Sequence, residues 1–176
     1  MSDDNLITRY QQFRTRRFLK NHERTRNMLP SWRTRGRRRL LTGVVAVSIA
    51  LFALCGVLVV AADRMWALPL LPITAVFFAA WTALQIVSSR QGDAPRDALD
   101  EWEIARRNSA RSVGLTVTQV VGMIPTAILI YASSTADVDR DLAYACGVWF
   151  VAALLAGGCL PAMLLAWSEP DSEPED

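Results

Sequence analysis

Residues 33–39 (RTRGRRR) and the uncharged run at residues 40–62 (LLTGVVAVSIALFALCGVLVVAA) decide the fold. As a helix rising 1.5 Å per residue, the second stretch would be about 35 Å long, which is enough to cross a hydrocarbon core of ~30 Å. Arginine and lysine beside a span favour the cytoplasmic side of the membrane. The sequence therefore predicts a transmembrane helix whose N-terminal end faces the cytoplasm.

Three further apolar segments follow this span. The second begins at Trp66, a residue type typical of the membrane interface, and has Pro69 and Pro72 in its first turns, where a missing N–H costs least. The sequence predicts an all-α integral membrane domain over residues 40–167, with four transmembrane helices in two hairpins. The expected spans are about 40–62, 66–87, 113–132 and 142–167, with a cytosolic loop at 88–112.

The distribution of basic residues predicts the orientation. With a cytoplasmic N-terminus, the inner segments hold seventeen Arg and Lys, and the outer loops hold only Arg64 and Arg140. Such a bias in short loops sets topology. Both termini are therefore expected in the cytoplasm.

Residues 1–39 carry twelve Arg and Lys against three acidic residues. On a helical wheel the apolar residues of this arm gather on one face, which predicts a basic amphipathic helix that lies on an anionic inner leaflet. A solvated basic arm is the alternative. Nucleic acid is not favoured, because no RNA- or DNA-binding module surrounds the arginines and aromatic residues at 10–18. The residues expected to contact lipid or a partner are Phe13, Arg14, Arg16, Arg17, Phe18, Arg37, Arg38, Arg39 and Trp102.

The predicted spans contain no Asp, Glu, Lys, Arg or His, so a proton-coupled transporter would lack its usual carrier. Polar residues do occur at similar depth in spans two and three, and we expect hydrogen bonds between these two helices, for example from Thr82 to Gln119. A polar permeation site is the alternative interpretation. The polar residues are Thr82, Gln85, Thr116, Thr118 and Gln119.

Small residues recur every fourth position and predict grooves for neighbouring helices. They are Ala75, Ala79 and Ala83 in span two, and the pairs Ala152–Ala156 and Ala153–Gly157 in span four. Pro125 and Pro161 are expected to kink spans three and four, although a discontinuous transporter helix would show the same residues.

Cysteine and histidine give no sign of metal, cofactor or enzyme chemistry. Cys55, Cys146 and Cys159 all lie in predicted spans without a Cys-x-x-Cys motif, and His22 is the only histidine. Buried cysteine behaves as a small apolar residue. We expect no catalytic site, no cofactor and no small-molecule substrate.

Acidic residues precede basic ones in the inner loop, which suits the dipole of a helix that begins near Asp97 and continues into span three. The segment Leu99-Asp100-Glu101-Trp102-Glu103, followed by Arg106-Arg107 and Ala110-Arg111, resembles the juxtamembrane segment of small multi-pass membrane proteins of actinobacteria. Trp102 stands where a charged residue is usual in that pattern. The resemblance implies a bacterial plasma membrane and brings no activity with it.

The last segment, 168–176, has five acidic residues and no basic ones, which predicts a disordered tail. Because the tail and the basic arm are expected on the same side, we hypothesise that they contact each other.

Together these features favour a non-enzymatic structural or accessory subunit of a larger plasma-membrane assembly. The alternative is a self-oligomerising pore or small transporter, including a lysis or exclusion-type protein of a mobile element. The expected partners are anionic lipids of the inner leaflet and other membrane proteins or further copies of the chain.

Overall fold

The computed structural model describes residues 13, 34–88, 101–135 and 137–168, and the regular elements in these ranges are helices. They are α2 (Arg35–Ala61), the short 3-10 helix η2 (Arg64–Ala67), α3 (Leu70–Val87), α4 (Glu101–Thr135) and α5 (Arg140–Ser168). Four helical segments are long and apolar enough to cross a membrane, with η2 and α3 together forming the second. The chain is thus a multi-pass membrane protein. The rest of the predicted amphipathic arm and the acidic tail lie outside the described residues.

The helices extend beyond the predicted spans at the end where the arginines lie. α2 begins at Arg35, directly after Thr34, whose backbone is extended. α4 is a single helix of 35 residues, so the predicted continuation of the third span into a polar turn is confirmed from Glu101 onward. At 1.5 Å per residue α4 is about 52 Å long, well above the ~30 Å of a hydrocarbon core.

The two hairpin connections are short and are ordered by aspartates. The Asp63 carboxylate accepts a hydrogen bond of 2.8 Å from the Met65 backbone N–H, at the start of η2. Asp139 does the same for the Asp141 N–H at the start of α5, at 2.7 Å. The Arg64 guanidinium lies 3.7 Å from the Asp141 carboxylate and joins the two connections, although an exposed pair of this kind contributes only ~0–1 kcal/mol.

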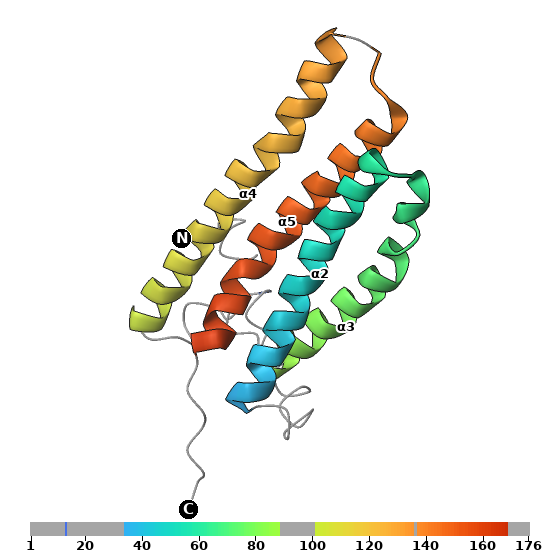
Figure 1. Ribbon diagram of the computed structural model, residues 1–176. Helices are drawn as coiled ribbons and strands as arrows, with labels where there is room; N and C mark the ends of the chain where they lie inside the picture. The colour runs from blue at the N-terminus through green and yellow to red at the C-terminus, as the bar shows by residue number, and fades with distance from the viewer. Residues whose placement is uncertain (1–12, 14–33, 89–100, 136, 169–176) are drawn as a thin grey trace, which may run out of the picture.

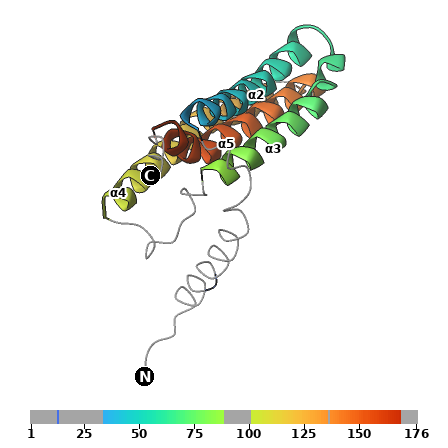
Figure 2. The same ribbon diagram turned by 90° about the horizontal axis from the view of Figure 1, so that it is seen from below.

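α5 is the central helix of the bundle. The main helix pairings are α4 with α5, α2 with α5, and α2 with α3. In Figure 1 the helices run in the order α4, α5, α2, α3, and α5 again lies beside α2 in Figure 2. In the most apolar stretch of α5, 39% of the residues are buried, whereas in that of α4 only 17% are. α4 is therefore held to the bundle mainly through α5.

The main apolar core is built by α2, α3 and α5. Its largest members are Phe52 from α2 and Phe77 from α3, whose rings meet edge to face with centroids 6.4 Å apart. α5 adds small side chains at Ala152, Cys159 and Ala166. Small residues on α5 let α2 pack closely against it, and Cys55, Cys146 and Cys159 are buried.

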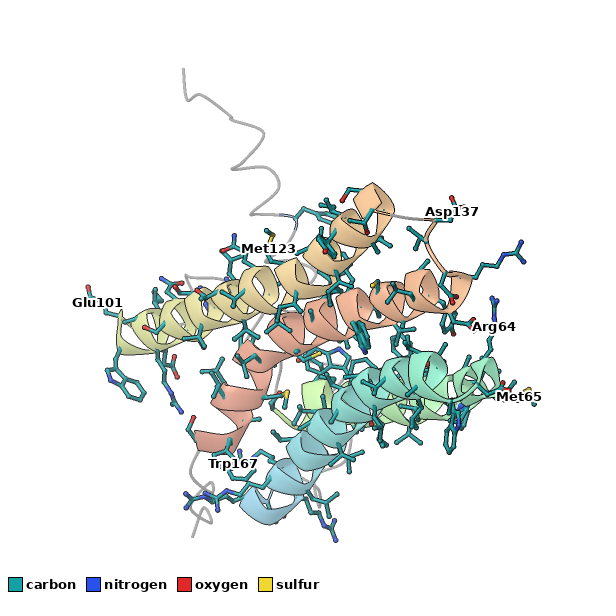
Figure 3. All side chains as sticks on the ribbon, turned by 45° about the horizontal axis from the view of Figure 1, so that its top comes forward. Arg64, Met65, Glu101, Met123, Asp137 and Trp167 are labelled. Carbon is teal, nitrogen blue, oxygen red and sulfur yellow. The ribbon has the colours of Figure 1, made fainter. Side chains whose placement is uncertain are left out.

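The bundle has two chemically different ends, which Figure 3 shows through the labelled Glu101 and Trp167 at one end and Arg64 and Asp137 at the other. At the first, which we call the basic end, α2 and α4 begin and α3 and α5 finish. Among the described residues, seven arginines lie there: Arg35, Arg37, Arg38, Arg39, Arg106, Arg107 and Arg111. The described part of the opposite end has only Arg64 and Arg140.

Candidate functional site

The crossing of α4 and α5 depends on two glycines. A methyl group on Gly157 would collide with the Thr118 hydroxyl and would lie 2.5 Å from the Gly114 carbonyl oxygen. A methyl group on Gly114 would likewise lie 2.5 Å from the Gly157 carbonyl oxygen. The two backbones thus approach to a distance that no other residue type permits, as in the small-residue crossings of membrane helices.

Pro161 adds a second constraint at this crossing. Because proline has no N–H, it cannot donate the helical hydrogen bond to the Gly157 carbonyl, four residues earlier. That oxygen faces Gly114, where a C–H···O contact can partly compensate for the missing bond. Figure 3 shows that α5 bends before it reaches Trp167, in keeping with the kink predicted from Pro161.

A cavity of about 470 Å³ lies beside this crossing, between α3 and α4, with α5 as its floor. We call it the basic-end cavity. Its volume is in the range of small-molecule sites, about 300–1,000 Å³. Its lining residues are Trp81 and Gln85 from α3, Arg111, Leu115 and Thr118 from α4, and Gly157, Gly158, Pro161 and Ala162 from α5.

A second cavity, of about 370 Å³, lies between α2, α4 and α5. Its walls are almost wholly apolar, with alanines at 46, 50 and 53 of α2 and at 152, 153 and 156 of α5. Trp149 also lines it, and the indole N–H of this residue donates a 2.9 Å hydrogen bond to the Ala53 carbonyl of α2. The indole lies against Gly56, where a Cβ atom would be 2.5 Å from Nε1.

The basic end joins α2, α4 and α5 through arginine and tryptophan. The Arg39 guanidinium lies 4.9 Å from the ring centre of Trp167, and that of Arg106 lies 5.2 Å from the ring centre of Trp102. Arg106 also donates a hydrogen bond to the Ser168 hydroxyl, which connects the start of α4 to the end of α5. Such cation–π pairs contribute about 0.5–1 kcal/mol each at exposed sites.

The polar residues for which we predict hydrogen bonds between spans two and three lie in different environments. Thr82, Thr116 and Gln119 are exposed, and the Thr116 hydroxyl donates to the Ser112 carbonyl of its own helix at 3.0 Å. α3 packs mainly on α2 and α4 mainly on α5, so α3 and α4 are not direct neighbours over most of their length. Gln85 and Thr118 line one cavity together, and the Thr118 hydroxyl donates to the Gly114 carbonyl of its own helix at 3.0 Å.

The predicted lipid- or partner-contacting residues fall into different environments. Phe13, Arg37 and Trp102 are exposed, and Arg39 is half-buried on Trp167. Arg38 differs from the prediction, because only 3% of it is exposed. Arg14, Arg16, Arg17 and Phe18 lie outside the described residues.

The small-residue stripe that packs in α4 is one that the sequence analysis missed. Ala110, Gly114, Thr118 and Gly122 recur every fourth residue and turn toward α5. Conversely, Ala75 and Ala79 of the predicted stripe in α3 are exposed. Both stripes repeat every four residues, so their spacing identifies each of them in the sequence. The spacing does not indicate that the stripe of α4 packs within the chain and that of α3 does not.

Groups of His, Cys, Asp or Glu suited to a metal ion are absent from the described residues. No protein family model, curated protein sequence or solved structure matches the chain.

Proposed function

We propose that the protein is a non-enzymatic accessory subunit that associates with another membrane protein through the outer face of α4. We define this face by the exposed residues Ser112, Thr116, Gln119, Met123, Ala127 and Ile130. They follow steps of three and four residues and lie away from the stripe that packs on α5. A continuous helical face of this kind suits contact with a second transmembrane helix.

Gln119 is the observation that carries the proposal. It lies six residues after Val113, the first residue of the apolar segment, and thus about 9 Å along the helix axis from it. A carboxamide has two N–H donors and an acceptor oxygen, which hydrocarbon cannot satisfy. In the part of the chain that the structure describes, no residue bonds to this side chain. A partner helix would supply the missing bonds, each worth about 0.6–2 kcal/mol in membranes.

The rest of the outer face favours a protein partner over a water-filled path. Met123 and Ile130 are each 64% exposed, and both are apolar. The Thr116 hydroxyl bonds to its own helix and has little need of water. A pore built from several copies would place Met123, Ala127 and Ile130 on its lumen, whereas a helix–helix contact would bury them.

The arginines support a cytoplasmic location for the basic end. Since α2 begins and α5 finishes there, both ends of the helical domain would face the cytoplasm. With the resemblance of the segment around Trp102 to actinobacterial membrane proteins, we place the protein in a bacterial plasma membrane.

The test is purification of the tagged full-length protein from its native membrane in mild detergent, with quantitative mass spectrometry of proteins that copurify. We expect a stoichiometric unrelated membrane protein with the wild type and its loss with Gln119→Leu. Val47→Leu is the matched control, because Val47 is 58% exposed and lies at a similar depth on α2.

A photocrosslinking residue distinguishes a specific contact from nonspecific copurification. At position 123 it should join the chain to the same partner, and at position 47 it should not. Crosslinks only between identical chains, together with ion conductance in vesicles, would overturn the proposal in favour of a pore. Retention of the partner by Gln119→Leu would overturn the role of the α4 face.

A further inference from the structure

The basic-end cavity has the chemistry of a lipid site, and we propose that it binds one anionic phospholipid from the leaflet at the basic end. This inference is independent of the association through α4. The outer face of that helix includes none of the residues that line the cavity.

The lining residues are ordered along the membrane normal. α4 runs away from the basic end, so Arg111 is nearest the surface and Thr118 lies about 10 Å deeper. α3 and α5 run toward that end, which places Gln85 above Trp81 and Ala162 above Gly157. α3 and α4 therefore present Gln85 and Arg111 near the surface, and α5 contributes only small or apolar residues to the cavity.

A phospholipid has the same order of chemistry. Arg111 precedes the apolar segment by two residues, so its guanidinium can reach the level of the headgroups, where it can pair with a phosphate oxygen. The Gln85 carboxamide can donate to a phosphate or ester oxygen. Deeper in the cavity, Trp81 and Leu115 offer apolar walls to an acyl chain.

The floor of the cavity leaves room for that chain. Gly158 has no side chain, and a Cβ atom on it would meet no other atom within 4 Å. Basic pockets between transmembrane helices on the cytoplasmic side are a recognised type of site for anionic headgroups. The charge at the rim thus favours an anionic lipid over a zwitterionic one, and the open floor leaves space for its acyl chain.

Native mass spectrometry of the full-length protein tests this directly. The delipidated protein is titrated in mild detergent with phosphatidylglycerol or phosphatidylethanolamine, and the first bound lipid is counted. We expect a preference for phosphatidylglycerol, which Arg111→Gln lowers about tenfold, as for the loss of one charge-assisted hydrogen bond. Arg37→Gln removes the same charge at the same end outside the cavity and should leave the preference unchanged.

A second variant fills the cavity without touching a packed surface. Gly158→Leu should abolish the first high-affinity lipid, while Gly147→Leu, on the same helix and in equally open space, should not. Equal binding by the wild type and Gly158→Leu would overturn the proposal. Equal losses in Arg111→Gln and Arg37→Gln would also overturn it, because they would indicate a diffuse attraction of the basic end rather than a site.

Discussion

Gly157 sets how closely α4 and α5 can approach. In this position even one methyl group would meet the Thr118 hydroxyl and the Gly114 carbonyl oxygen. The neighbouring Gly158 has open space around it, so two adjacent glycines of one helix have opposite roles. One is required by packing, and the other leaves the basic-end cavity open.

We expect Gly157→Ala to lower the free energy of unfolding in detergent by about 1–3 kcal/mol, as for other overpacked sites. Gly158→Ala should leave it unchanged or raise it slightly, because alanine favours a helix more than glycine does. Thermal unfolding of the purified variants, followed by circular dichroism, measures both. Equal unfolding temperatures for the two variants would contradict the close approach of the α4 and α5 backbones at Gly157.

Trp149 shows a similar dependence on a missing side chain. Its indole N–H donates to the Ala53 carbonyl at 2.9 Å, and its ring occupies the space that Gly56 leaves. A buried indole N–H needs an acceptor, and α2 supplies one from its own backbone. The contact fixes the rotation of α5 relative to α2.

At the scale of the elements, α4 is the least buried of the four long helices and the longest. Its length exceeds the hydrocarbon core by about 20 Å, so a large part of it must lie in the headgroup region or in water. The acidic residues Glu101 and Glu103 in its first turn suit the positive end of the helix dipole. The polar extension and the span are therefore one continuous helix.

Cysteine labelling of α4 checks this arrangement. We expect Glu103→Cys to react with an impermeant maleimide only from the side of the basic end, and Asp137→Cys, beyond the other end of α4, only from the opposite side. Leu115→Cys should stay unlabelled from either side. The wild type gives the baseline, since Cys55, Cys146 and Cys159 are buried. Reaction of both end positions from one side would contradict a membrane-crossing α4.

The positions of the helices could be predicted from the sequence, but which helix packs against which could not. Each span can be located because a helix that crosses hydrocarbon needs a long apolar run, and charged residues mark where that run ends. The choice between Ala75-x₃-Ala79 of α3 and Gly114-x₃-Thr118 of α4 depends on which helices meet, and period alone does not encode this. The expected bond between Thr82 and Gln119 stays a prediction, and both residues are exposed in the structure, because equal depth does not imply facing sides.

For the whole molecule, the asymmetry of charge exceeds what orientation requires. In the expected topology, replacing Arg37, Arg38 and Arg39 by glutamine would still leave fourteen Arg and Lys in the inner segments against two in the outer loops. We expect the triple variant to keep the wild-type orientation, which labelling of Asp137→Cys in intact cells measures. A mixed orientation would show that the arginines beside α2 dominate the insertion of the whole chain.

The basic-end cavity also could not be found from the sequence. It needs Trp81, Arg111 and Gly158, which come from three helices, and the relative placement of these helices follows from the α4–α5 crossing. In the sequence, Arg111 is one of several arginines at a membrane boundary, and nothing in its position indicates a cavity.

The central position of α5 has a consequence for biosynthesis. α2 and α3 can pair as soon as both have left the ribosome, but α4, which is made next, has its main packing partner in α5, the last of the four to be synthesised. Until α5 has been inserted, the glycines and threonines of α4 face lipid. Translation that stops within the connection at 136–139 would thus release a chain in which α2 and α3 can pair but α4 lacks its main packing partner, the kind of product that membrane quality control removes.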